Sequence, residues 1–440
     1  MAVLFKGGTL LPCTRDPSGA VAPAVRADLL VRDGRIAAIL PPDSPAPPDA
    51  DVRSAVGRLI LPGLVQIHVH LVQTLFRGLA DDLALLDWLR TRIWPLERAH
   101  DHDSVYWSAR LGLTELLLGG TTAILDMATV NHTDAVFEAA AEVGMRAFIG
   151  KAMMDRDNEA GLGESTARSL ESSVALRDRW HRQGRLRYAF APRFVPSCTE
   201  TLLRETVTAA RERGCLLHTH ASENTDEVAL VRQLTGRDNV RYLDDVGLTG
   251  PDVVLAHCIH LSPEEEALLA RTRTVVAHCP SSNLKLASGV ARISALLGEG
   301  VRIGVGADGA PCNNRLDAFT ELRTAALLQK VHHGAASLPA PVALGLMTSA
   351  GADALGLDTG ALEVGRPADL VLLDADAPSA WGGGDPRAAV VYAHSPGTVR
   401  EVWIEGERVV SDGVVRGWDL AETIRGCAAA LTRVRERAGL

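Results

Sequence analysis

The chain has 440 residues, with 45 Lys or Arg against 54 Asp or Glu, so its formal net charge is −9 at pH 7. That length favours a large barrel domain with a smaller companion over one small core. The 47% share of hydrophobic residues excludes intrinsic disorder, and an acidic chain without a basic block argues against a nucleic-acid polymer as partner. No stretch approaches the ~20 apolar residues of a membrane span, and the opening MAVLFK lacks the order of a secretory signal.

Seven cysteines are scattered along the chain and form no Cys-x-x-Cys pair. This pattern indicates neither a disulfide framework nor a cysteine zinc site, and a reducing, cytoplasmic location is expected. Any bound metal would therefore take its ligands from carboxylates and from the fourteen histidines.

Both ends of the chain show short β patterns. Residues 27–40 alternate and turn at Asp33-Gly34, which is a hairpin signal. Residues 368–374 and 399–411 have the same character, with a second turn at Glu405-Gly406. Neither end is long enough to bury a sheet face alone, so the two ends are predicted to pair.

The middle of the chain alternates apolar runs with amphipathic helical patterns. The candidate strands are 64–68, 121–126, 146–152, 186–192, 215–220, 253–257, 274–278 and 302–307. Helical patterns include 199–213 and 262–271, and the second opens with Ser262-Pro263-Glu264-Glu265, a capping box with Pro at the first position. Eight strands alternating with helices predict an α/β fold, a (β/α)8 TIM barrel.

Three sequence regions follow from these patterns. Residues 1–58 are expected to form the N-terminal half of a small β-sandwich domain, 59–362 the barrel, and 363–440 the C-terminal half of the sandwich with a terminal helix. The loop 155–165 is expected to form a lid over a site at the barrel mouth.

Four histidines and one aspartate fall at the ends of four candidate strands. His68 and His70 are alternate residues of the first strand, so both imidazoles can face one metal. His220, His257 and Asp308 end the fifth, sixth and eighth strands. Polar residues are common at strand ends, but barrel active sites gather at these C-terminal ends, and five such residues are hard to explain as packing.

This set suits Zn²⁺ or another divalent ion with a water in an open position. Such a site needs a proton carrier that is not itself a ligand. Glu223 stands three residues after His220, close enough to reach the water from the following loop. The alternative is a solvated loop carboxylate, because Asp226 and Glu227 follow closely.

Several long motifs of the chain resemble the amidohydrolase superfamily, and within it the branch of metal-dependent purine and triazine deaminases and chlorohydrolases. The motifs are LPGLVQIHVH (61–70), LHTHASEN (217–224), VLAHCIHL (254–261), AHCPSSNLKLASG (277–289), GADGAPCNNRLDAFTELR (306–323) and VGRPADLVLLD (364–374). The resemblance covers nearly the whole chain, including both β-rich ends.

The resemblance implies roles for these residues. One metal ion, Zn²⁺ or Fe²⁺, would be held by His68, His70, His220 and Asp308. His257 would orient the attacking water, Glu223 would carry protons to the ring nitrogen and the leaving ammonia, and Asp308 would also take the water's proton. Binuclear relatives use a carboxylated Lys at the end of the fourth strand, where this chain has Arg193, so a single metal is expected.

The substrate contacts implied by the resemblance divide between two purine classes. Glu97 stands where similar deaminases hold ribose hydroxyls or the purine edge, although it could be one more charge on an Arg-rich helix. Gln73 and Arg193 match guanine deaminases, in which an amide and a guanidinium read the base. The paired Asn313-Asn314 instead matches deaminases of adenosine, 5'-deoxyadenosine, methylthioadenosine and S-adenosylhomocysteine.

We therefore expect an aminohydrolase that releases ammonia from a small purine, with an adenine nucleoside as the first choice of substrate. The first alternative is a guanine deaminase, and the further one is an s-triazine chlorohydrolase or aminohydrolase. Retention of Glu223 and His257 favours ammonia loss, because an amine needs protonation to leave and chloride does not. A catalytically dead scaffold would be expected to lack ligands that this chain retains. Similar enzymes are commonly dimers or larger, so a homo-oligomer is expected, and no membrane partner is expected.

Overall fold

The computed structural model describes residues 2–156 and 160–440, so residues 157–159 of the expected lid lie outside the described residues. In the described chain, hydrogen bonds connect the strands into one sheet of ten and one sheet of nine. No helix in these two ranges is long and apolar enough to cross a membrane.

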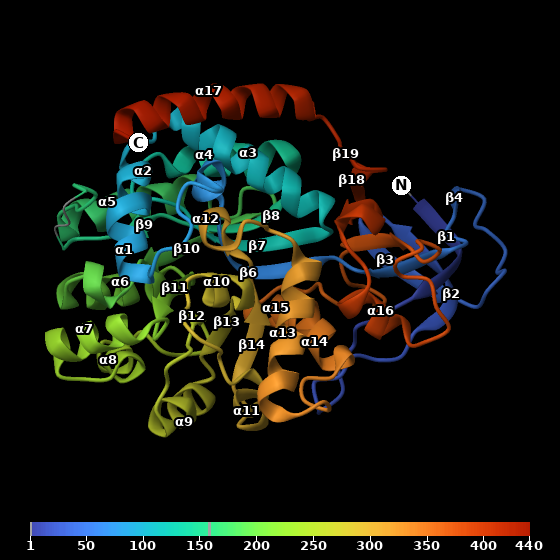
Figure 1. Ribbon diagram of the computed structural model, residues 1–440. Helices are drawn as coiled ribbons and strands as arrows, with labels where there is room; N and C mark the ends of the chain where they lie inside the picture. Colours follow the sequence, from blue (N-terminus) through green and yellow to red (C-terminus); the bar gives the residue numbers. More distant parts are fainter. Residues whose placement is uncertain (1, 157–159) are drawn as a thin grey trace. The chain divides into compact units, whose positions relative to one another are not determined.

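The ten-stranded sheet is a parallel barrel whose strands follow chain order (Figure 1). Its strands are β6 (Leu64–His70), β7 (Thr121–Met127), β8 (Arg146–Gly150), β9 (Ala152–Met153), β10 (Leu186–Pro192), β11 (Leu216–Ala221), β12 (Val253–His257), β13 (Val275–His278), β14 (Arg302–Val305) and β15 (Asp308–Gly309). Because β9 continues β8 and β15 continues β14, the ten described segments fill eight positions. The last segment, β15, pairs with β6, which closes the predicted (β/α)8 barrel.

The eighth strand is interrupted where it approaches the first. A Cβ atom at Gly306 would lie only 2.4 Å from the backbone oxygen of His68. No side chain fits there, so glycine is required for β14 and β15 to pass this close to β6. The close approach brings Asp308 opposite Val69 and therefore next to both histidines of the first strand.

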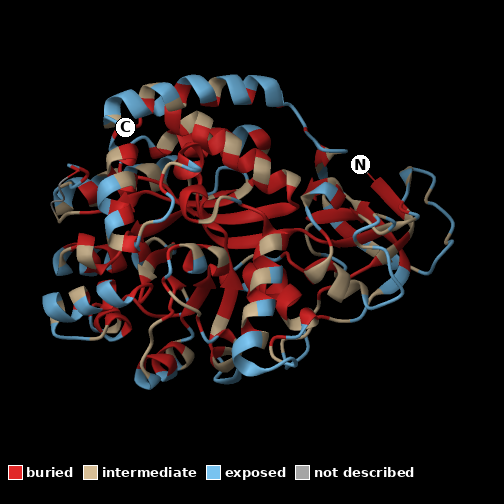
Figure 2. Cartoon of the chain, in the orientation of Figure 1, coloured by how far each residue is buried: buried red, intermediate tan, exposed pale blue. Residues whose placement is uncertain are grey.

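Helices alternate with the barrel strands, and the strands themselves are buried, as the red segments of Figure 2 show. Those in the barrel region are α1 (Leu85–Trp88), α2 (Trp94–Arg98), α3 (His102–Leu118), α4 (Thr133–Val143), α5 (Thr166–Trp180), α6 (Glu200–Glu212), α7 (Thr225–Thr235), α8 (Asn239–Asp245), α9 (Pro263–Thr272), α10 (Pro280–Lys285), α11 (Ile293–Gly298) and α12 (Ala310–Asn313). The helices predicted at 199–213 and 262–271 are α6 and α9. The predicted capping box is confirmed, because the Ser262 side chain accepts from the backbone of Glu265 and the Glu265 side chain accepts from that of Ser262.

The nine-stranded sheet joins the two ends of the chain, as predicted. Its strands are β1 (Ala2–Leu10), β2 (Val25–Arg32), β3 (Arg35–Leu40), β4 (Ala50–Ser54), β5 (Arg58–Pro62), β16 (Leu370–Asp374), β17 (Val399–Ile404), β18 (Glu407–Ser411) and β19 (Val414–Val415). Antiparallel pairing of β5 with β16 connects the N-terminal and C-terminal halves. The sheet curls over its own core, so that Phe5 and Trp403 meet edge to face at 5.3 Å.

Two compact units are present among the described residues. One contains residues up to Gln66, Thr114–Ala123 and Asp317–Trp418, with helices α13 (Ala318–His333), α14 (Ala340–Leu346), α15 (Ser349–Ala354) and α16 (Pro386–Tyr392). The other contains Ile67–Leu113, Ile124–Leu316 and Asp419–Leu440.

The terminal helix α17 (Leu420–Ala438) belongs to this second unit, whereas the predicted boundaries grouped it with the β-rich ends. Its buried residues Cys427, Ala430 and Val434 join an apolar cluster built from the segments after β6. Burial of this apolar face explains the difference, since hydrophobic contact decides which unit a terminal helix joins.

Candidate active site

The C-terminal ends of the barrel strands bring the predicted metal ligands together. His68 and His70 end β6, His220 lies at the end of β11, and Asp308 begins β15. One ligand atom from each of these four residues lies within 4.8 Å of the others. The Nε2 atoms of His68 and His70 are each 3.3 Å from Oδ1 of Asp308.

This cluster fits a divalent cation by the chemistry of its donors. Nε2 of His68 is completely buried and has no hydrogen-bond partner among the described residues. The Nε2 atoms of His70 and His220 are 3.2 Å apart on stacked rings. Three imidazole nitrogens and one carboxylate that converge in a buried space match the donor set of zinc sites.

A second layer of hydrogen bonds orients each of the three imidazoles. Nδ1–H of His70 donates to the Met127 backbone oxygen at 2.7 Å, and Nδ1–H of His220 donates to the Arg193 backbone oxygen at 2.7 Å. Both Nε2 lone pairs therefore point into the cluster. His218, which we interpret as a structural residue, places its Nε2 2.8 Å from Nδ1 of His68.

Burial also favours the neutral form of the three imidazoles in the cluster. It lowers the pKa of His70 to about 4 and lowers the pKa values of His68 and His220. These imidazoles are neutral at physiological pH, and neutral imidazole is the form that binds metal.

Glu223 is buried at the edge of the cluster and is not a solvated loop residue. It follows Ser222, whose φ of 53° turns the chain sharply after β11. Its Oε2 atom lies 3.3 Å from Nε2 of His257, and its Oε1 accepts a hydrogen bond from Ser288 at 3.3 Å. Burial raises the pKa of Glu223 to about 7, so this carboxyl can hold or release a proton near neutral pH.

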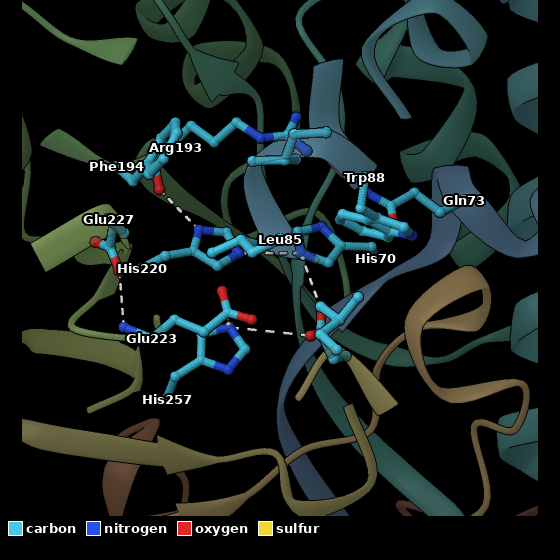
Figure 3. A pocket seen from close by; sticks show the side chains of 13 residues that line it. His70, Gln73, Leu85, Trp88, Arg193, Phe194, His220, Glu223, Glu227 and His257 are labelled. Atoms are coloured by element: carbon cyan, nitrogen blue, oxygen red, sulfur yellow. Dashed lines mark hydrogen bonds and ion pairs between the residues drawn. The ribbon is translucent and has the colours of Figure 1, made fainter. Parts of the chain in front are cut away.

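Nε2 of His257 lies 3.3 Å from Oε2 of Glu223, beside which it stands in Figure 3, and 3.9 Å from Oδ2 of Asp308. Burial opposes its protonation, but the carboxylates of Glu223 and Asp308 raise its pKa above the ordinary value. Both His257 and Asp308 have a left-handed backbone, with φ of 73° and 63°. Such conformations in non-glycine residues cluster at active sites, where the surrounding structure holds them.

Two neighbouring residues of α10 contact this pair, and sequence reasoning did not single them out. Ser282 donates a hydrogen bond to Oδ2 of Asp308 at 2.6 Å, and Asn283 Oδ1 accepts one from Nδ1–H of His257 at 2.8 Å. The only sequence signal was their place in the motif SSNLKLASG, which gave neither residue a role.

Three of the four predicted substrate residues, Gln73, Glu97 and Arg193, form one buried network. Arg193 donates to both carboxylate oxygens of Glu97, at 2.7 and 3.1 Å. Gln73 and Thr129 each donate a further bond to Glu97, at 2.8 and 3.0 Å. Burial opposes ionisation of Glu97, but Arg193 holds its pKa below the ordinary value.

Both carboxylate oxygens of Glu97 therefore already accept hydrogen bonds from protein side chains. Ribose hydroxyls could bind Glu97 only by replacing some of these bonds. Oε1 of Gln73, in contrast, is buried without a hydrogen-bond partner among the described residues. Gln73 and Arg193 line the cavity over the metal cluster, together with Trp88 and Phe194 (Figure 3). The amide of Asn313, the fourth predicted substrate residue, donates to the Ala307 backbone oxygen at 2.7 Å, and Asn313 is not among the residues that line this cavity.

A barrel with this constellation at its mouth defines a class of metal-dependent hydrolases. The sequence profile of the amidohydrolase family matches residues 59–409. The chain belongs to this family.

Two curated relatives and one solved structure show how far the similarity extends. The chain is 39% identical to a 5'-deoxyadenosine deaminase of Methanothermobacter thermautotrophicus, over 92% of this chain and 95% of the relative. It is 37% identical to a 5-methylthioadenosine/S-adenosylhomocysteine deaminase of Moorella thermoacetica, over 96% of both chains. The crystal structure of an adenosine deaminase from Xanthomonas campestris with bound zinc superposes with a TM-score of 0.91 at 30% identity, covering 99% of this chain and 98% of the other.

Proposed function

We propose that this protein is a metal-dependent hydrolytic deaminase that releases ammonia from an adenine nucleoside. The observation that carries the proposal is the buried Glu223, with a pKa of about 7, facing His257 beside a four-ligand metal cluster. Hydrolytic removal of an amino group needs an activated water and a group that can protonate the leaving nitrogen. The cluster and Glu223 meet these two needs.

The protein's own groups account for the proton movements. A bound divalent ion, for which we propose Zn²⁺ with Fe²⁺ as the alternative, would act as a Lewis acid that lowers the pKa of a water molecule. Asp308 would take one proton of the attacking water. Glu223, protonated at the start, would give its proton to the ring nitrogen, then take the remaining hydroxyl proton and pass it to the departing amine, while His257 orients the water and stabilises negative charge. The proton held by Asp308 would return to Glu223 and restore the starting state. One water is consumed, the C–N bond breaks, and ammonia leaves with a 6-oxopurine as co-product.

The proposed substrates are adenosine, 5'-deoxyadenosine, methylthioadenosine and S-adenosylhomocysteine, because the chain is similar over almost its full length to enzymes named for such nucleosides. Guanine is the second candidate. One observation favours it. The Glu97 carboxylate already accepts hydrogen bonds from Arg193 and Gln73, whereas the Gln73 oxygen has no partner among the described residues and could accept a hydrogen bond from a base N–H.

Ammonia release from a panel of purified substrates tests the proposal. The panel contains these four nucleosides, guanine and a chlorotriazine, with chloride release measured for the last. We expect turnover of at least one adenine nucleoside with a kcat/KM well above that of guanine. Turnover of guanine alone would replace the first candidate with the second, and chloride release without ammonia would contradict deamination altogether.

A further inference from the structure

One short segment after β13 contacts all three groups that handle protons in the proposed mechanism. Ser282 and Asn283 of α10 contact Asp308 and His257, respectively, at 2.6 and 2.8 Å. Ser288, just beyond the helix, donates to Glu223. Asp308, His257 and Glu223 come from three different strand ends, yet each is hydrogen-bonded to this one segment.

The backbone of the segment is itself fixed. The amide of Ser288 donates to the backbone oxygen of Asn283 at 2.8 Å, directly after Ala287, whose φ is 52°. The Ser288 backbone oxygen is held by Nε2–H of His260 at 2.7 Å. The next residue, Gly289, adopts a φ of 130° beside His260, which favours glycine. The turn after α10 is therefore locked onto the loop that follows β12.

All three contacting side chains are almost completely buried. Ser282 is 0% exposed, Asn283 1% and Ser288 3%. A side chain buried to this degree has few alternative conformations, and water does not compete for its hydrogen bond. The bond therefore holds the partner side chain in one orientation. Contacts of this kind orient catalytic and metal-binding groups.

We propose that the side chains of Ser282, Asn283 and Ser288 form a positioning clamp that sets the orientation of the three proton-handling groups together. The Asn283 oxygen can only accept, so the clamp keeps the proton of His257 on Nδ1 and turns Nε2 towards Glu223. Ser282 occupies Oδ2 of Asp308, which leaves Oδ1 towards His68 and His70. The inference about turnover rests on the proposed function, whereas the inference about Asp308 concerns metal binding alone.

The first test is kinetic and uses Asn283. Asn283→Leu removes the acceptor at nearly constant volume, and kcat should fall about 10- to 100-fold with little change in KM. Asn283→Asp retains an oxygen that can accept from Nδ1–H, and kcat should recover to within about fivefold of the wild type. If Asn283→Leu does not fold, Asn283→Ala carries the same expectation. Equal losses in the Asp and Leu variants, or no loss in either, would overturn the clamp at His257.

The second test measures Zn²⁺ affinity by competition with a chromophoric chelator and needs no substrate. Ser282→Ala should weaken Zn²⁺ binding about 10- to 100-fold, because Asp308 loses the bond that orients it. Leu284→Ala is the matched control, since Leu284 lies on the same helix and its side chain is 44% exposed. It should leave affinity and kcat unchanged.

The two proposals fail separately. If the wild type releases no ammonia from any purine, the proposed function falls, while the affinity of Ser282→Ala still decides the metal-side contact. If the wild type is active and Ser282→Ala binds Zn²⁺ as tightly as the wild type, the clamp at Asp308 is wrong and the function stands.

Discussion

At Glu223, burial creates the chemical property on which the proposed reaction depends. An exposed glutamate would be ionised at neutral pH and would have no proton to give. Here burial raises the pKa to about 7, with Ser288 and His257 as the polar neighbours of the carboxyl. Asp226, three residues further on, is exposed and has no such environment.

We expect Glu223→Gln to keep its metal and lose almost all turnover. The amide preserves size and hydrogen bonding but cannot transfer a proton, and general acid–base catalysis contributes about 10²–10⁴-fold. The measurements are kcat from ammonia release and metal content from elemental analysis. Asp226→Asn, the same chemical change at a nearby exposed acid, should have wild-type kcat. A Glu223→Gln enzyme with near-normal kcat would remove this residue from the mechanism.

The ligand cluster could be predicted from sequence because strand alternation and strand ends determine where His68, His70 and Asp308 point. The clamp could not, since Ser282 and Asn283 are each 26 residues from their partners and their direction depends on the path of a short helix. The same limit applies to Glu97, because the Arg193 side chain that donates hydrogen bonds to it is 96 residues away in the sequence.

Among the elements, α7 and α9 both begin with a capping box, but the glutamates of the two boxes bind different further groups. In each, a buried glutamate in the first turn accepts from backbone N–H groups ahead of the helix. Glu265 accepts from Ser262 and Val240, both remote from the cavity. Glu227 accepts from the backbone of Glu223 at 2.7 Å and from Asn239 at 2.6 Å. The start of α7 therefore fixes the backbone of the proposed proton carrier.

Comparison of Glu227→Ala with Glu265→Ala should separate stability from catalysis. Each variant loses a capping contact and leaves buried N–H groups unpaired, so each should be destabilised by about 1–3 kcal/mol. Only Glu227→Ala should also lose kcat, because Glu223 is no longer held against His257. Thermal unfolding and steady-state kinetics on both proteins provide the test. Equal kcat values in the two variants would show that α7 does not position Glu223.

The elements themselves were predictable where local chemistry determines them. The strong start signal of α9 and the Asp33-Gly34 and Glu405-Gly406 turns are found as expected, and all four turn residues have positive φ. The π-helical turn Leu89–Ile93 was not predicted, because its extra residue is set by the packing of Leu89 and Ile93 in the interior rather than by a local signal.

For the molecule as a whole, the metal cluster lies at the seam where the barrel closes. β15 and β6 share only two register pairs, Asp308↔Val69 and Gly309↔His70. His68 and His70 lie on one side of this seam and Asp308 lies on the other, while His220 reaches the same point from β11. A metal ion bound by all four would cross-link the first, fifth and eighth strands.

We therefore expect metal removal to lower the unfolding temperature of the chain and re-addition of Zn²⁺ to restore it. An ion that binds only the folded state stabilises it by about 4 kcal/mol when free metal is 1,000 times the Kd. Differential scanning calorimetry on the protein as purified, after chelation and after Zn²⁺ return, measures the shift, and elemental analysis of the first sample identifies the resident ion and its stoichiometry. Asp308→Ala is the control, because it lacks one ligand across the seam and its unfolding temperature should respond weakly to Zn²⁺. An unchanged unfolding temperature in verified metal-free wild type would show that the closing strands are held by β pairing and packing alone.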